Sequence, residues 1–499
     1  MEKTPVIILK SLNVNRGGVT KAAIKRANLY AEKYPNVIIL TTNFQINHKL
    51  IIDKLYEKEL SKKVKVYNFF EYYRMTTKNI KPKNKHIHEV NERGFDVVRM
   101  EEHSGYSYRY YKEGVYKKYK KYNNDKKLNF IDYREHGFLR NKREEYDNTG
   151  RLVRTRHVDT RNNNYILDIY YGMNNECVLT VHLSSSTGEE GNVVYFGKEN
   201  KLYKTLKDMQ KEWVSLILSK YSNVILIGEQ RYHDYILYDI DRSVKTVFVV
   251  HSNHLLSPYT DNTKPSPAYK KLLSMKDKIN KIVVLTEEQK EDMNLIASLG
   301  EKIEVIPHAW NEGKGLNENI KKIPNKVVMV ARYVVDKRVD HAIRSFEEVV
   351  KVLPSSKLEI FGNGPLKSEL QKLINKKGLS ENVYLKGYTD NVHAEYASAM
   401  CSIITSRREG FGMVITESLA SGSPVIAYNF KYGPKDIITN NENGIIVEKD
   451  NISDLSQAIL KVLTEPKLQR KLSEKAIETR TSFSEDDYKK RWLKLIEEL

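Results

Sequence analysis

The feature that most constrains the fold is the regular alternation of short apolar strands and helices in the last third of the chain. Strands are expected at residues 327–330, 357–361, 383–385, 402–405 and 425–427, and helices around residues 340–352, 365–376, 392–399 and 414–421. Strand–helix alternation at this spacing is typical of a doubly wound sheet. We therefore predict an α/β fold for this part of the chain.

A second parallel sheet is predicted from the start of the chain. Residues 6–9 and 37–41 are short apolar runs, and residues 20–34 between them keep their apolar positions at helical spacing. This order indicates a βαβ unit. The pattern resumes near Trp213, and Thr286 opens a capping-box pattern at the start of a helix. The later strands of this sheet are expected at residues 224–227, 246–250 and 281–285.

Residues 62–203 have a different character. Tyrosines are frequent there, and short alternating segments are broken by turns that contain Asn and Gly. Residues 143–146 and 151–154 look like the two arms of one hairpin. Because tyrosine suits half-buried pleated faces, we predict an antiparallel β insertion.

The chain has 499 residues, which is too long for a single core. We expect an N-terminal Rossmann-like lobe at residues 1–60 and 206–318, interrupted by the β-rich insertion at residues 61–205. A C-terminal Rossmann-like lobe is expected at residues 319–485, followed by a helix at residues 486–499.

The charge balance is basic, with 83 Lys and Arg against 64 Asp and Glu, a formal charge of +19. This balance favours a polyanionic partner, although an ordinary basic solvated face explains it equally well. A local excess surrounds the single acid Glu71, and it could follow polymer phosphates or form a solvated loop. Its cations are Lys62, Lys63, Lys65, Arg74, Lys78, Lys81, Lys83 and Lys85. No nucleic-acid recognition module is visible, so we expect no nucleic-acid partner.

Cysteine usage and hydropathy indicate the compartment. Cys177 and Cys401 lie far apart, which fits a reducing compartment better than a disulfide framework or a metal knuckle. No stretch approaches the roughly 18 consecutive apolar residues of a membrane span. We expect a cytoplasmic protein with at most peripheral contact at the inner membrane face.

The strongest motif combines a Gly-rich turn with two carboxylates at a strand end and a helix start. Its residues are Glu409, Gly410, Phe411, Gly412, Met413, Val414 and Glu417. Glycines let the backbone approach a ligand closely, and the N–H groups of a new helix face an anion. Glu417 in the first helical turns could accept from ribose hydroxyls, and Glu409 lies at the sheet edge where ligands bind. A tight strand–helix turn with two solvated carboxylates is the alternative.

Arg332 and Lys337 form the second motif, directly after the expected strand at residues 327–330. A bidentate Arg and a point-charge Lys at this position could converge on a diphosphate and neutralise it as a leaving group. Two cations in a loop are otherwise usually solvent-facing.

Weaker signals follow other expected strands. Gly17 and Gly18 form part of a glycine-rich phosphate turn, and Gly387 with Tyr388 could hold a base edge through backbone groups. His251 follows the strand at residues 246–250 and could contact a sugar, or it could be a polar strand end. No HExxH pattern or Cys partner supports a metal site.

Together these motifs resemble the retaining family-4 glycosyltransferases of the GT-B fold. The resemblance covers residues 5–44 and about 205–485. Within that family, residues 15–20, 67–72 and 431–434 look like the wall teichoic acid α-glycosyltransferases, which also carry a β-rich insertion in the first lobe.

The resemblance implies roles for the candidate residues. Arg332 and Lys337 would bind the UDP diphosphate, and Glu417 the ribose. Glu409 would contact the hydroxyls of the donor sugar, and His251 would contact the sugar from the other lobe. The family needs no metal and no further cofactor, because cations and helix ends replace them.

The resemblance also implies the reaction. Gly17 and Gly18 would bring backbone N–H groups near the β-phosphate of a UDP-hexose. The hexose, with glucose favoured, would pass to hydroxyls of poly(glycerol phosphate) wall teichoic acid, and the insertion would form a trimer. The alternatives are N-acetylglucosamine transfer to poly(ribitol phosphate), O-glycosylation of serine-rich adhesins, and a non-catalytic partner subunit.

Overall fold

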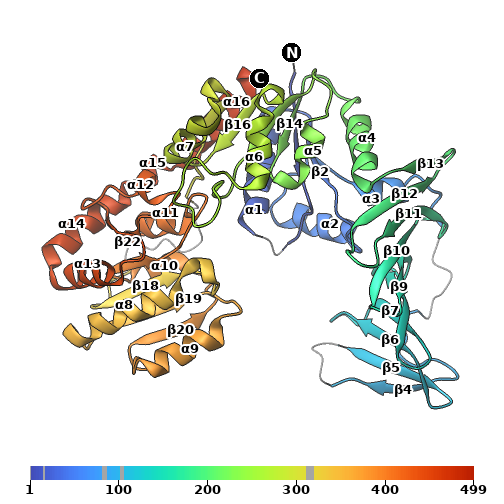
Figure 1. The fold of residues 1–499 in the computed structure, drawn as a ribbon, viewed down its shortest axis with the longest axis horizontal. Coiled ribbons are helices and arrows are strands. Elements are labelled where there is room, and N and C mark those ends of the chain that lie inside the picture. Colours follow the sequence, from blue (N-terminus) through green and yellow to red (C-terminus); the bar gives the residue numbers. More distant parts are fainter. Residues whose placement is uncertain (1, 15–16, 81–86, 102–105, 311–319) are drawn as a thin grey trace. The chain divides into compact units, whose positions relative to one another are not determined.

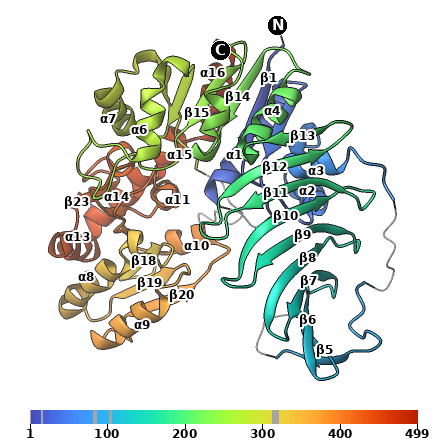
Figure 2. The same ribbon diagram turned by 45° about the vertical axis from the view of Figure 1, so that its right-hand side comes forward.

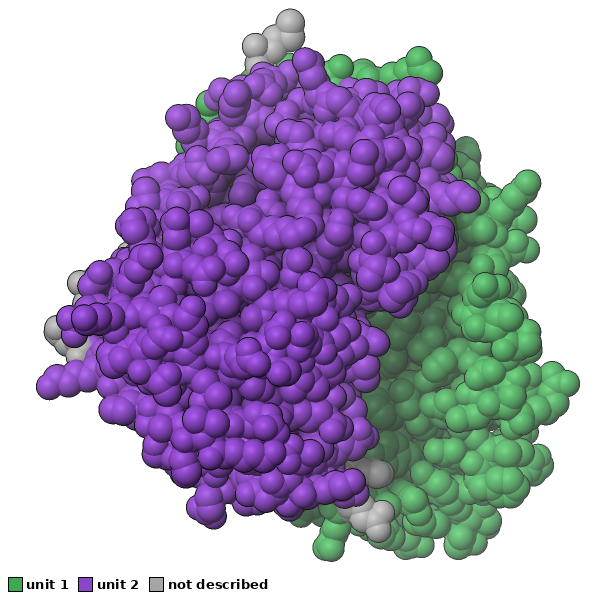
Figure 3. All heavy atoms as spheres, turned by 60° about the vertical axis from the view of Figure 1, so that its left-hand side comes forward, with its two compact units in different colours: residues 1–228, 232–245 green, residues 229–231, 246–499 purple. Residues whose placement is uncertain are grey.

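The computed structural model describes residues 2–14, 17–80, 87–101, 106–310 and 320–499 (Figure 1). The chain divides into two compact units (Figure 3). Unit 1 comprises Met1–Gly228 and Tyr232–Lys245, and unit 2 comprises Glu229–Arg231 and Thr246–Leu499. This division is coarser than the expected domains, whose boundaries remain predictions.

Unit 1 begins with parallel strands in the order β14-β1-β2-β3. They are β1 (Thr4–Leu9), β2 (Val37–Thr41), β3 (Val64–Asn68) and β14 (Val224–Gly228). Every residue of β1 and β2 is buried, as expected for parallel strands covered on both faces. The helices of this unit are α1 (Gly18–Lys33), α2 (His48–Lys58), α3 (Phe69–Arg74), α4 (Leu206–Leu218) and α5 (Asp234–Leu237). The predicted βαβ opening is confirmed.

The insertion is an antiparallel sheet in which strands pair in chain order (Figure 2). Its strands are β4 (Asp96–Arg99), β5 (Ser107–Lys112), β6 (Val115–Tyr122), β7 (Leu128–Glu135), β8 (Leu139–Tyr146), β9 (Leu152–Asp159), β10 (Asn164–Tyr171), β11 (Cys177–Leu183), β12 (Glu190–Phe196) and β13 (Asn200–Tyr203). The predicted hairpin is confirmed, because Glu145 pairs with Arg154 and Gly150 turns the chain at a φ of 81°. Phe44 and Phe70 pack on Tyr170 of β10, with ring centroids 5.1 and 4.6 Å apart, which joins the sheet to the rest of unit 1.

Unit 2 contains the parallel strands β15 (Lys245–Val249), β16 (Lys281–Val284) and β17 (Ile303–Val305). Helices α6 (Pro267–Ser274) and α7 (Glu287–Ala297) accompany them. The Thr286 hydroxyl accepts from the backbone N–H of Gln289 at 3.2 Å, so the predicted cap of α7 is confirmed.

The rest of unit 2 is built on a parallel sheet with the strand order β20-β19-β18-β21-β22-β23. The strands are β18 (Lys326–Val330), β19 (Lys357–Phe361), β20 (Val383–Gly387), β21 (Cys401–Ile404), β22 (Val425–Tyr428) and β23 (Gly444–Val447). The helices are α8 (Val339–Val352), α9 (Lys367–Lys376), α10 (Val392–Ala397), α11 (Met413–Ala420), α12 (Pro434–Ile437), α13 (Ile452–Thr464), α14 (Pro466–Ile477), α15 (Thr479–Ser482) and α16 (Glu485–Glu498). The predicted doubly wound sheet is confirmed.

None of the helices in the described ranges combines the length and the apolar character needed to cross a membrane.

Candidate functional site

The sheet of β18–β23 has a point at which its strand order reverses. β18 is its first strand in sequence, and the later strands are added on one side as β19 and β20 and on the other side as β21, β22 and β23. In open α/β sheets, ligands bind outside the carboxyl ends of the strands at such a point. The loop after β18 carries Arg332 and Lys337, and the loop after β21 carries Glu409.

Lys337 and Glu409 meet at this point. The Lys337 ammonium donates to Oε1 of Glu409, and the Ser406 hydroxyl donates to the same oxygen at 2.8 Å. The side chains of Lys337 and Glu409 are 18 % and 17 % exposed. The Thr405 hydroxyl donates to the carbonyl of Lys337 at 2.9 Å, which fixes one loop on the other. The fold therefore holds a mostly buried cation and carboxylate where a ligand would bind.

His251, from the loop after β15, reaches the same place through its backbone. A Cβ atom on Gly410 would lie 2.0 Å from the carbonyl oxygen of His251, so only glycine fits there. Asn253 donates its side-chain amide to the carbonyl of Lys431 at 2.9 Å, and the N–H of Tyr432 donates to the carbonyl of Glu409 at 3.1 Å. The loops at His251, Glu409 and Lys431 thus form one connected structure.

A buried polar cluster supports this connection. The Tyr432 hydroxyl donates to Asp292 at 2.7 Å, and the Lys431 ammonium donates to the same carboxylate. His254, fully buried, stacks on the Tyr432 ring with centroids 5.7 Å apart. Burial, with a further contribution from Lys431, lowers the pKa of His254 to about 4, so its ring is neutral at pH 7. Gly433 continues the loop at a φ of 121° and packs its backbone against the carbonyl of Phe411.

Glu229 is a candidate residue that the sequence reasoning missed. Its Oε2 lies 2.7 Å from Nε2 of His251, and its side chain is fully buried. A carboxylate at this distance favours the tautomer with the proton on Nε2, which leaves a lone pair on Nδ1 of His251. The sequence feature that could have indicated Glu229 is its position as an acid directly after the apolar strand β14.

The Gly-rich motif leads into α11. Gly412 adopts a φ of 87°, and α11 begins at Met413 with no acidic residue in its first turn. The first N–H groups of a helix have no partner within the helix and carry partial positive charge, which suits an anion. The Phe411 side chain, only 2 % exposed, packs against His308 and Phe483. A donor contact at Phe411 is therefore limited to its backbone.

The remaining predicted residues of this sheet are Arg332, Gly387, Tyr388 and Glu417. Arg332 is exposed, and no hydrogen bond or ion pair joins its side chain to another described residue. Gly387 ends β20 at a φ of 81°, and Tyr388 is 81 % exposed. Glu417 lies on α11. Burial, and then the charge of Glu417, raise the pKa of Tyr396.

The predicted glycine turn lies in unit 1. Gly17 caps α1 with a φ of −79°, and a Cβ atom on Gly17 or Gly18 would meet no atom within 4 Å. The local structure therefore does not itself require glycine at either position. Asn15 and Arg16 of the same turn are outside the described residues.

A metal site was not expected. Across the described ranges, no group of three or more His, Cys, Asp or Glu residues gathers where it could hold a metal ion. The charged groups of the site are instead Lys337 and Glu409, with Arg332 in the same loop as Lys337.

Comparison with known proteins gives matches over the whole chain. Residues 316–479 match the family described as Glycosyl transferases group 1. The chain is 28 % identical over 502 residues to poly(glycerol-phosphate) alpha-glucosyltransferase of Bacillus subtilis (strain 168), covering 96 % of this chain and 72 % of the relative. It is 27 % identical over 512 residues to poly(ribitol-phosphate) alpha-N-acetylglucosaminyltransferase of Staphylococcus aureus (strain COL), covering 98 % of each chain.

The fold is also similar to solved structures. One is a mutant of S. aureus TarM in complex with fondaparinux, α-GlcNAc-glycerol and UDP, at a TM-score of 0.84 and 24 % identity. The match covers 99 % of this chain and 100 % of that chain. These comparisons confirm the predicted GT-B fold with its β-rich insertion, and they confirm the resemblance predicted from the motifs.

Proposed function

We propose that this chain, a glycosyltransferase with the GT-B fold that resembles the wall teichoic acid α-glycosyltransferases, transfers a hexose from a UDP-sugar to hydroxyl groups of a polyol phosphate polymer. The observation that carries the proposal is the contact of Lys337 with Glu409 at the reversal point of the sheet. The donor needs a cation for its diphosphate and a carboxylate for its sugar hydroxyls, and this contact supplies both in one place.

Donor binding would exchange the partners of this contact. A diphosphate carries more negative charge than one carboxylate, so Lys337 would turn from Glu409 to the diphosphate and Arg332 would join it. Glu409 would then accept from the sugar hydroxyls, and Glu417 from the ribose. The N–H groups at the start of α11 would add positive potential near the phosphates.

The reaction follows from these positions. The bond between the sugar C1 and the UDP oxygen breaks while Arg332 and Lys337 neutralise the departing diphosphate. The acceptor hydroxyl attacks C1 from the face that UDP leaves, and the departing phosphate oxygen takes its proton. The new bond keeps the α configuration without a dedicated protein base. His251, held by Glu229, would face the sugar with its carbonyl or its ring.

The donor and acceptor within this class are also proposed. We favour glucose and poly(glycerol phosphate), the sugar and polymer named for the Bacillus relative. The Staphylococcus relative, at nearly the same identity, is named for N-acetylglucosamine and poly(ribitol phosphate). Trimer formation through the insertion belongs to the same proposal, and light scattering of the purified chain measures it.

The experiment is a matrix of two donors and three acceptors. UDP-glucose and UDP-N-acetylglucosamine are each offered with poly(glycerol phosphate), poly(ribitol phosphate) and a serine-rich peptide. We expect α-linked glucose on poly(glycerol phosphate), identified by NMR of the anomeric proton. Transfer to the peptide alone, a β-linked product, or no use of any UDP-sugar would each reject the proposal.

Replacing Glu229 by glutamine tests the role of the buried acid. We expect kcat to fall by about 10- to 150-fold, because loss of a charged hydrogen-bond partner typically costs about 1.5–3 kcal/mol and the amide no longer fixes the His251 tautomer. The KM for the UDP-sugar should stay unchanged, since Glu229 is buried behind His251. Steady-state kinetics provide the measurement.

Glu348→Gln is the matched control, because Glu348 is 53 % exposed and pairs only with Lys351 among the described residues. Equal kcat values for Glu229→Gln and Glu348→Gln would show that Glu229 does not position His251.

A further inference from the structure

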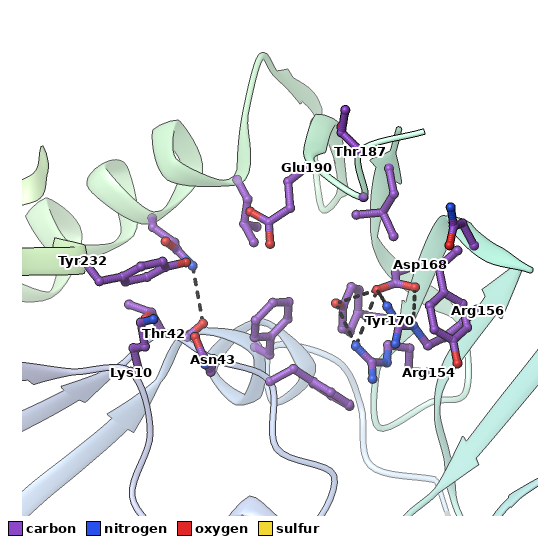
Figure 4. Close-up of a pocket in the computed structure, with 18 of the residues that line it drawn as sticks. Lys10, Thr42, Asn43, Arg154, Arg156, Asp168, Tyr170, Thr187, Glu190 and Tyr232 are labelled. Atoms are coloured by element: carbon purple, nitrogen blue, oxygen red, sulfur yellow. Dashed lines mark hydrogen bonds and ion pairs between the residues drawn. The ribbon is translucent and has the colours of Figure 1, made fainter. Parts of the chain in front are cut away.

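Unit 1 contains a polar pocket of about 700 Å³ (Figure 4). Its inner end is formed by residues that directly follow parallel strands, with Lys10 after β1 and Thr42 and Asn43 after β2. Strands β9 to β12 of the insertion, the loop that contains Thr187, and helices α3 and α4 also contribute to its walls. The pocket thus lies at the carboxyl edge of an open α/β sheet, where such folds bind ligands, and its volume is ordinary for a ligand site.

Two arginines are fixed in its wall by two buried acids, Asp168 and Glu145. Asp168, only 3 % exposed, accepts from Nε of Arg156 at 2.7 Å and from Nη2 of Arg156 at 3.1 Å. Arg154 donates to Glu145 at 2.6 Å and approaches Asp168 at 3.5 Å. Nη2 of Arg154 and Nη1 of Arg156 have no partner among the described residues, so each guanidinium keeps a donor for a ligand.

Lys10 provides a third cation. Its ammonium lies 4.1 Å from the centroid of the Tyr232 ring, and it pairs with no acid in the described part of the chain. The guanidinium of Arg156 likewise covers the Tyr165 ring at 3.5 Å. Because cations lie over these two rings, the covered ring faces are not open for a ligand to stack on. The pocket would therefore bind a ligand mainly through charge and hydrogen bonds. Asn163, Asn164, Ser186, Thr187 and Gln210 add neutral donors and acceptors.

We propose that this pocket binds a segment of the polyol phosphate acceptor. The inference rests on the proposed function and names the acceptor-binding residues on unit 1. Lys10 and the free guanidinium nitrogens of Arg154 and Arg156 bind phosphate oxygens, while the amide and hydroxyl side chains and Glu190 bind polyol hydroxyls. A polyol phosphate has no flat ring to stack and carries both groups at every repeat. It therefore matches the three cations and the mixed polar lining better than an uncharged peptide does.

The test separates acceptor binding from donor chemistry. In Lys10→Gln we expect the KM for poly(glycerol phosphate) to rise about tenfold, the range of a lost charge-assisted hydrogen bond, without change in the KM for the UDP-sugar. This difference in KM between the variant and the wild type should shrink at high salt, because salt screens the attraction between Lys10 and the polymer phosphates in the wild type. Lys54→Gln, which removes an exposed lysine of α2, is the charge-matched control and should behave as the wild type.

A second variant fills the pocket. Thr187 is exposed and lines the pocket, so Thr187→Trp should block polymer transfer and leave UDP-sugar hydrolysis and the melting temperature unchanged. If the wild type is active and the KM for the polymer is unchanged in both Lys10→Gln and Thr187→Trp, the pocket does not bind the acceptor. That result would overturn the inference and leave the proposed function standing. The inference would also be overturned if these variants raised the KM for a peptide acceptor and left the KM for the polymer unchanged. A wild type that hydrolyses UDP-sugar but glycosylates no polyol phosphate would remove the proposed function and the inference with it.

Discussion

Replacing Lys337 by alanine is expected to lower kcat by about 100- to 1,000-fold, the usual cost of removing one preorganised charge donor from a leaving group. The physical reason is that Lys337 is mostly buried and already directed to the reversal point of the sheet by its contact with Glu409. Its charge acts most strongly as the diphosphate departs, so kcat should fall more than binding of the UDP-sugar. Steady-state kinetics with saturating polymer measure the change.

Two further variants separate charge from folding. Lys351→Ala removes a lysine that is 62 % exposed and should leave both kcat and the melting temperature near wild type. Lys337→Arg keeps the charge and should retain part of the activity, because arginine also binds phosphate. Turnover of Lys337→Ala within twofold of wild type would remove the role assigned to this residue.

The second large effect is expected at Gly410. The Cβ atom of an alanine would lie 2.0 Å from the carbonyl oxygen and 2.6 Å from the carbonyl carbon of His251. The two backbones must then separate by about 1 Å, a displacement that can cost about 100-fold in rate when it affects positioning groups. We expect kcat/KM of Gly410→Ala to fall by that factor, with a lower melting temperature.

Gly191→Ala is the matched control, because its added Cβ would lie 3.6 Å from the nearest atom, an ordinary contact. Wild-type kinetics in Gly410→Ala would mean that the approach of the two loops does not matter for the reaction. A lower melting temperature with unchanged kcat/KM would mean that the contact only stabilises unit 2.

Much of the fold could be predicted because the signals are local. The apolar runs of β1, β2 and β18 are buried strands, and their periodicity depends only on neighbouring residues. The cap at Thr286 is likewise local. Element ends were less accurate, since β20 continues to Gly387, two residues beyond the expected strand. That extension depends on pairing with β19 through a register shift, which the sequence of β20 alone does not encode.

Site residues that directly follow strand ends could be predicted from the sequence. Residues whose position depends on how loops and side chains pack could not. Lys337 and Glu409 were both expected near a ligand, and the strand order brings them together. Glu229 was missed because its contact with His251 depends on how two loops pack. Phe411 was expected to contact the donor, yet its side chain lies in the interior, since a Gly-rich turn does not show which way its aromatic residue points.

The most direct test of the account is calorimetric titration of UDP in the presence of EDTA, with the wild type, Arg332→Ala and Lys337→Ala. If protein cations hold the diphosphate, the wild type binds UDP without metal, and each variant binds at least about tenfold more weakly. Binding that EDTA abolishes in the wild type, or that stays equal in all three proteins, would contradict it.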